Sequence, residues 1–91
     1  MTEFPIYMFC NMGEQYVNIL SEDKGMAIDL HYNPTTGEVR YGYKSLDKRI
    51  IKELIEKPGI YKPATASDWN YAKGRFLNWV QKALEAQISQ E

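Results

Sequence analysis

The sequence predicts an α+β domain in which four antiparallel strands are followed by two helices. Apolar residues alternate with polar ones up to about residue 44, and they recur at helical spacing from residue 46 onward. Gly-, Pro- and Asn-containing turns separate the segments of the first half. We therefore expect one domain, 1–91, with a sheet at 5–45, helices at about 46–57 and 66–88, and both helices packed on one face of the sheet, a two-layer ββββαα arrangement.

The four predicted strands are short segments rich in β-branched and aromatic residues, at 6–11, 15–21, 26–32 and 39–45. The turn at 11–14 contains Gly13, which supplies the positive φ that a two-residue hairpin loop needs. The turn at 33–38 contains Asn33, Pro34 and Gly37, a combination that favours a four-residue loop with Asn33 facing Glu38.

A consistent strand register follows from that last turn. It pairs Leu30 with Tyr41 and Ile28 with Tyr43, so apolar residues meet apolar residues. Extending the register through the polar turn at 22–25 and the turn at 11–14 adds further apolar pairs: Ile19 with Ile28, Val17 with Leu30, Met8 with Val17, and Ile6 with Ile19. The four strands would then share one inner face, which includes Tyr32, Tyr41 and Tyr43.

The first predicted helix, 46–57, has a one-sided apolar stripe formed by Leu46, Ile50, Ile51, Leu54 and Ile55. Ser45 is its expected N-cap, and Pro58-Gly59 ends it. An extended segment, 60–65, then crosses to the second helix.

The second predicted helix begins after Thr65, because Thr65 and Asp68 resemble a capping box with Asp in place of Glu. Its main stripe is Trp69, Ala72, Phe76, Val80, Ala83 and Leu84. Gly74 lowers the helix propensity by about 1 kcal/mol relative to Ala and favours close approach of another backbone.

The outer face of the first two strands is predicted to be unusually apolar. In this register it displays Tyr7, Phe9, Tyr16 and Leu20, with Asp29 and His31 near the rim. A solvated sheet face should be polar, and aromatic residues at an apolar patch are typical interface anchors. The patch is therefore a candidate partner-binding surface, unless the first strand has another register, the tail at 85–91 covers it, or a homodimer forms through this face.

Catalytic and cofactor signatures are not apparent. The single histidine, His31, is predicted on a flat sheet face beside Asp29 and opposite Arg40, whereas a catalytic histidine usually lies in a pocket. One His and one Cys do not make a zinc site, and the glycines are scattered as turn residues rather than gathered in a phosphate-binding loop. We expect no enzyme activity, no metal and no cofactor.

Nucleic-acid binding is the alternative function. The residues that would serve it are the basic side chains of the last strand and the second helix: Arg40, Lys44, Lys73, Arg75 and Lys82. The net charge of −1 and the pI of about 5.8 argue against a strongly basic DNA-binding surface.

The location is predicted to be cytoplasmic. Cys10, the single cysteine, lies in an apolar run and reads as a buried thiol in a reducing compartment. No apolar run approaches the length of about 18 residues that a membrane span needs, and the N-terminus lacks a signal-peptide pattern.

The leading hypothesis is a small non-enzymatic protein that binds and inhibits another protein. Residues 1–45 carry six acidic and three basic side chains, a net charge of −3, whereas residues 46–91 carry six acidic and eight basic ones, a net charge of +2. The acidic sheet half would occlude a basic site on a toxin or a host enzyme. Small acidic single-domain chains of this kind are similar in size and composition to toxin-immunity proteins and to phage or mobile-element inhibitors of host defence.

Overall fold

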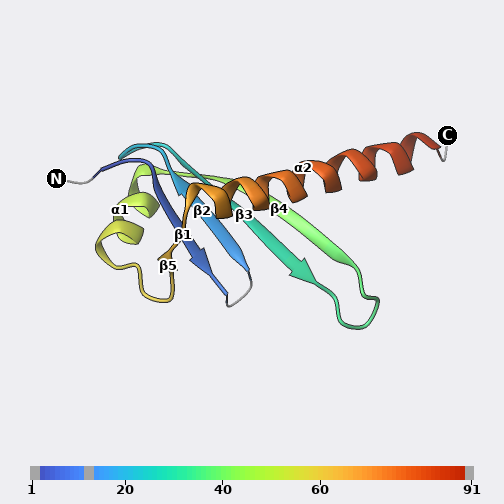
Figure 1. Cartoon of the computed structure of the whole chain (residues 1–91), viewed down its shortest axis with the longest axis horizontal. Helices are drawn as coiled ribbons and strands as arrows, with labels where there is room; N and C mark the ends of the chain where they lie inside the picture. Colours follow the sequence, from blue (N-terminus) through green and yellow to red (C-terminus); the bar gives the residue numbers. More distant parts are fainter. Residues whose placement is uncertain (1–2, 12–13, 90–91) are drawn as a thin grey trace.

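The computed structural model describes residues 3–11 and 14–89, and only the backbone of residues 87–89. The secondary-structure elements follow one another along the chain as β1 (Ile6–Cys10), β2 (Gln15–Ile19), β3 (Gly25–Tyr32), β4 (Val39–Leu46), α1 (Lys48–Glu56), β5 (Lys62–Pro63) and α2 (Ala66–Ser89). Figure 1 shows the strands side by side, with α1 at one end of the sheet and α2 running across it. Met12 and Gly13, the predicted corner of the first hairpin, lie outside the described residues.

The α+β class is confirmed, but the sheet has five strands rather than four. Its order is β4-β3-β2-β1-β5, and all neighbouring strands are antiparallel. The additional strand comes from the segment that was predicted only to cross between the helices. Lys62 pairs with Phe9, Pro63 pairs with Met8, and the Ala64 N–H donates to the Tyr7 carbonyl oxygen at 2.9 Å. The extended crossing segment thereby covers the free edge of β1.

Two of the three predicted hairpin registers are confirmed. Met8 pairs with Val17 in the first hairpin, and Leu30 pairs with Tyr41 in the last. The closing turn of the last hairpin also has its predicted form, because the Asn33 N–H donates to the Glu38 carbonyl oxygen at 2.8 Å and Gly37 has φ of 74°.

The predicted register between β2 and β3 is wrong by three residues. Val17 pairs with Ala27 rather than Leu30, because the connecting loop runs from Leu20 to Lys24 and closes with a hydrogen bond from the Leu20 N–H to the Lys24 carbonyl oxygen at 2.8 Å. Successive side chains of a strand point to opposite faces, so an odd shift moves every side chain of β3 and β4 to the other face.

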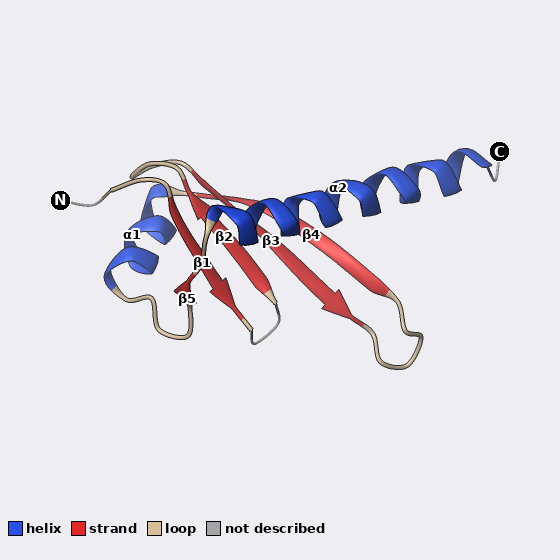
Figure 2. Ribbon diagram, viewed as in Figure 1, coloured by secondary structure: helices blue, strands red, loops and turns tan. Residues whose placement is uncertain are grey.

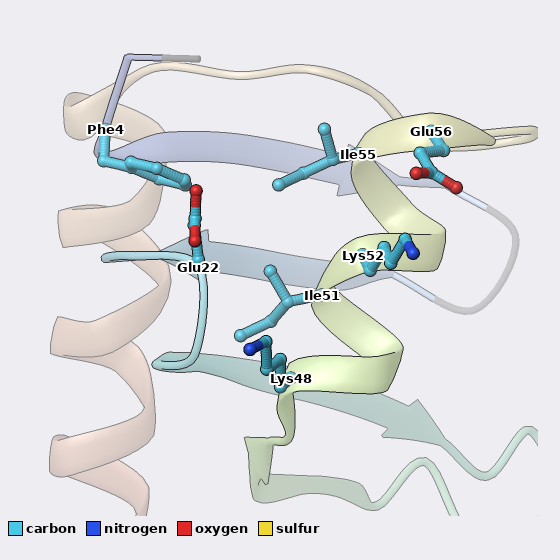
Figure 3. A pocket seen from close by; sticks show the side chains of 7 residues that line it. All are labelled: Phe4, Glu22, Lys48, Ile51, Lys52, Ile55 and Glu56. Atoms are coloured by element: carbon cyan, nitrogen blue, oxygen red, sulfur yellow. The ribbon is translucent and has the colours of Figure 1, made fainter. Parts of the chain in front are cut away.

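The two helices consequently lie on opposite faces of the sheet, and the prediction of a two-layer domain is wrong. The face of Val17, Ile19 and Ala27 packs against Ile51 of α1. The other face carries Tyr41 and Tyr43, whose rings lie 5.9 Å from Trp79 and 6.1 Å from Phe76 of α2. Figure 3, viewed from the α1 side, shows the sheet between α1 and α2.

Helix α1 is shorter than predicted and is capped by a different residue. Strand β4 continues through Leu46, so the N-cap is Asp47 rather than Ser45, and its carboxylate accepts a hydrogen bond from the Ile50 N–H at 2.9 Å. The side chain of Ile51 is fully buried between α1 and the sheet. The close approach is possible because Gly25 has no side chain: a Cβ there would lie 3.3 Å from the Ile51 Cδ1 atom and from the Asn18 carbonyl oxygen.

Helix α2 begins as the sequence predicts. The Asp68 carboxylate accepts from the Thr65 N–H at 2.9 Å, and the Asp68 N–H donates to the Thr65 Oγ1 atom at 3.1 Å. Trp69 and Ala72 are buried against the sheet. Gly74 faces open space, with no atom within 4 Å of its built Cβ position, so the predicted close backbone approach at Gly74 is wrong.

The last part of α2 continues beyond the β4 edge of the sheet, and we call residues 81–89 the overhang (Figure 2). It contributes to an elongated molecule with principal extents of 52 × 25 × 24 Å. In the described part of the chain, neither helix combines the length and the apolar character that crossing a membrane would require.

Candidate protein-interaction surface

Aromatic rings from the sheet and from α2 gather along one flank of α2. The group consists of residues from β1, β2, β4 and α2, which we call the aromatic row: Phe9, Tyr16, Tyr41, Tyr71 and Trp79, arranged around Arg75. The rings of Phe9 and Tyr16 are 4.9 Å apart at one end. The rings of Tyr41 and Trp79 are 5.9 Å apart at the other.

Arg75 joins Tyr71 of α2 to Tyr41 of β4. Its guanidinium carbon lies 5.4 Å from the centre of the Tyr71 ring and 5.8 Å from that of the Tyr41 ring, within the range of a cation–π interaction. Its Nη1 atom also donates to the Tyr71 hydroxyl oxygen at 3.4 Å. Burial is the largest single influence on the pKa of the Arg75 guanidinium and lowers it, but Tyr41, Tyr71 and Glu14 together outweigh burial and raise the pKa. The cation therefore stays charged while an aromatic frame holds it.

Two acidic residues, Glu14 and Asp68, act electrostatically on Tyr16. Burial is the main cause of its raised pKa, and the negative charge of Glu14 adds to it, with smaller effects from Tyr71 and Asp68. The phenol therefore stays neutral as a hydrogen-bond donor over a wider pH range than usual. The end of the row at Tyr16 thus combines aromatic rings with acidic side chains.

The row is accessible to a partner. Phe9, Tyr16, Tyr41 and Trp79 are half-buried, and Tyr71 is 60% exposed. Tyr, Trp and Arg are the residues most enriched among the energetically dominant contacts of protein interfaces. Half-buried rings lose little side-chain freedom on binding, so such a surface suits recognition of another protein.

The apolar patch that the sequence predicts is only partly assembled. Phe9 and Tyr16 belong to the aromatic row. The half-buried Tyr7 lies on the same face of the sheet, which is the face that α2 crosses. Leu20 is 45% exposed and lies in the loop between β2 and β3. The two residues predicted at the rim are elsewhere: Asp29 and His31 lie on the α1 side of the sheet, because of the altered β2–β3 register.

His31 and Asp29 keep their predicted neighbours on β4. His31 is opposite Arg40, and Asp29 is opposite Gly42. The exposed His31 lines a shallow hollow of about 250 Å³ at the tip of the last hairpin, where the Arg40 Nε atom donates to the Glu38 carboxylate at 3.3 Å. Over residues 3–11 and 14–89, no three His, Cys, Asp or Glu side chains are grouped closely enough to hold a metal ion.

The basic residues of the nucleic-acid alternative are divided between the two faces. Arg40 and Lys44 alternate along β4 with Tyr41 and Tyr43, so they point away from α2. Lys73, Arg75 and Lys82 lie on α2, and Arg75 is held by the aromatic row. The five residues do not form one basic surface.

A hollow of about 340 Å³ lies between α1 and the N-terminal segment, as Figure 3 shows. Its base is apolar and its rim is charged with both signs; the lining residues are Phe4, Glu22, Lys48, Ile51, Lys52, Ile55 and Glu56. None of these is a nucleophile paired with a histidine, and Ile51 and Ile55 also pack in the core. The hollow therefore lies at the edge of the hydrophobic core.

The sequence contains a signal for part of the aromatic row on α2. Tyr71, Arg75 and Trp79 are spaced at i, i+4 and i+8, which places them on one flank of a helix. Tyr41 is predicted beneath a helix, but the sequence does not indicate that Trp79 is the residue that packs against it. The missing information was the face on which α2 packs.

Comparison of the chain with known protein families, with curated proteins and with solved structures finds no match to any of the three. The candidate surface is therefore assigned from its own geometry and chemistry.

Proposed function

We propose that the protein is a non-enzymatic protein whose function is to bind another protein through the aromatic row. The observation that carries the proposal is Arg75, which lies against the rings of both Tyr41 and Tyr71 on an accessible flank of α2. Two half-buried rings from β1 and β2 extend this surface toward the acidic Glu14. A partner would bury these rings and contact Arg75 through a carboxylate or a carbonyl oxygen.

The mode of action in this proposal is occlusion. A partner with a basic rim would be attracted by the acidic side chains near Tyr16, and the aromatic row would then cover its functional site. An inhibitor of the toxin-immunity type or the phage anti-defence type would act in this way. The proposed inhibitor role and the cytoplasmic location both rest on the charge distribution and composition of the chain.

Co-purification from the native host tests the proposal, with variants Tyr71→Ala and Arg75→Ala compared with the wild-type protein. Both side chains are exposed, so the variants should fold, and each should reduce the recovered partner about tenfold or more. Lys73→Ala is the matched control, because it removes an exposed cation from the same helix outside the row. Equal recovery of the partner with all three variants would discard the aromatic row as the binding surface.

A further inference from the structure

Strand β4 has an outer edge against which no strand lies in the described part of the chain. It is eight residues long and forms one end of the sheet. The hydrogen bond from the Asn33 N–H to the Glu38 carbonyl oxygen shows which residues of β4 direct their backbone N–H and C=O groups toward β3. Antiparallel pairs alternate, so the N–H and C=O groups of Val39, Tyr41, Tyr43 and Ser45 point outward from this edge.

Helix α2 extends over the space beside this edge. Its apolar stripe contacts β4 through Phe76 and Trp79. The stripe continues through the half-buried Val80 into the overhang, where it contains Ala83 and Leu84. Ala83 and Leu84 are exposed, Leu84 at 54%. The nine residues of the overhang span about 13 Å, whereas a neighbouring strand needs about 4.8 Å. The overhang is therefore long enough to cover a further strand paired with β4.

The side chains of β4 define the chemistry that such a strand should have. On the α2 face, Tyr41 and Tyr43 would lie beside its residues, and apolar side chains are favoured there. On the opposite face, the exposed Arg40 and Lys44 flank Gly42, and acidic side chains are favoured opposite these cations. An extended segment that alternates apolar with acidic residues fits both faces.

A second copy of this chain fits the edge poorly. A symmetric pair of β4 strands centred on Gly42 would place Arg40 opposite Lys44 of the other copy, twice. The symmetry axis would be perpendicular to the sheet, so both α2 helices would lie on the same face. Each helix crosses β4 between Tyr41 and Tyr43, so the two helices would meet above the same pair of strands.

We infer that the partner protein supplies an extended segment of alternating apolar and acidic residues, which adds to β4 as a sixth strand beneath the overhang. This inference rests on the proposed function, because it specifies how a protein partner is held. Backbone hydrogen bonds to the outward groups of β4 would provide affinity, and the two faces of β4 would provide specificity. The aromatic row, which ends at Tyr41 and Trp79, would be continuous with the added strand.

The first test uses two synthetic eight-residue peptides, one alternating valine with glutamate and one alternating valine with lysine. Amide hydrogen exchange of the full chain, measured by NMR, should show new protection at Val39, Tyr41, Tyr43 and Ser45 with the glutamate peptide. The amides of Arg40, Gly42 and Lys44 already face β3 and should change little. The glutamate peptide should bind about tenfold more tightly than the lysine peptide, through two favourable charge pairs.

Two variants separate the edge from the overhang. Ser45→Pro removes an outward N–H without removing a β3 hydrogen bond, and Ala83→Asp places a charge above the added strand. Each should weaken the glutamate peptide about tenfold or more, while Lys82→Gln should leave its binding within about twofold. Unchanged exchange at the four outward amides, equal binding of the two peptides, or concentration-dependent self-association that protects these amides would each overturn the inference.

Co-purification from the native host distinguishes the proposed function from the strand-addition inference. If Tyr71→Ala abolishes partner recovery but Ser45→Pro and Ala83→Asp do not, the partner binds through the aromatic row without adding a strand. In that outcome the strand-addition inference falls and the proposed function stands. If all of these variants retain the partner, both are wrong.

Discussion

The two faces of the sheet are built from different kinds of side chain. Where α1 covers it, the α1 face is aliphatic and closed: Val17, Ile19, Ala27 and Ile51 have almost no exposed surface. The α2 face is aromatic and incompletely covered, because a single helix crosses it and leaves Tyr43 and Tyr71 more than half exposed. It also buries Asn18, whose side-chain oxygen accepts no hydrogen bond from the described residues.

The difference indicates that one face mainly stabilises the fold and the other mainly provides surface for a partner. Closely packed aliphatic side chains contribute stability roughly in proportion to their buried apolar area. Partly exposed aromatic and arginine side chains contribute less to folding and retain surface for a partner. We therefore expect substitutions on the α1 face to affect stability most, and substitutions on the α2 flank to affect binding most.

Ile51→Ala should have the largest effect on stability. It leaves a cavity beneath α1 in the aliphatic core, so the free energy of unfolding should fall by about 2–5 kcal/mol. Leu84→Ala on the exposed overhang is the matched control and should change it by less than about 0.5 kcal/mol. Urea denaturation monitored by circular dichroism measures both values, and similar losses for the two variants would contradict the contrast between the faces.

A pair of glycine substitutions should change stability in opposite directions. Gly25→Ala should lower the free energy of unfolding by about 1–3 kcal/mol, because the new methyl group would press on Ile51 and on the Asn18 backbone. Gly74→Ala should raise it by up to about 1 kcal/mol, because an unobstructed position within α2 gains helix propensity. The same denaturation experiment decides this, and stabilisation by Gly25→Ala would show that α1 is less closely packed than described.

The smallest expected effect is a pH dependence due to Tyr16. Its folded-state pKa is raised above the ordinary value of 10.0, mainly by burial and then by Glu14. The contribution to stability is therefore complete below about pH 10 and is lost as pH rises through the folded-state pKa. As pH rises above about 10, the wild-type protein should lose stability more steeply than Tyr16→Phe, as followed by urea denaturation. Parallel curves for the two proteins would contradict the raised pKa.

Local signals in the sequence were sufficient for most elements of the fold. The Asn33–Gly37 turn determined the last hairpin, and Thr65 with Asp68 determined the start of α2. The β2–β3 register was not predictable in the same way, because the polar segment after Ile19 is compatible with a short turn or with the observed loop of Leu20–Lys24. The two-residue strand β5 has no periodicity of its own and exists only because β1 offers a free edge.

The candidate site was less predictable than the fold because it depends on that one register. The sequence predicts Phe9 and Tyr16 at a partner surface because it places them on a sheet face without helices. In the structure they lie on the same face as α2, and Tyr71 and Arg75 complete the group. Side chains from β1, β2, β4 and α2 meet there, so residue spacing within any single segment does not reveal the row.

The length of the Leu20–Lys24 loop has a consequence for how this protein can change over generations. If one residue were inserted or deleted there while β3 stayed paired with β4, the side chains of β3 and β4 would exchange faces relative to those of β1 and β2. Tyr41 and Tyr43 would then point to the α1 face, and Arg40 and Lys44 would point to the face of Phe76 and Trp79. Point substitutions in this loop should be tolerated widely, whereas single-residue length variants should be eliminated together with the binding activity.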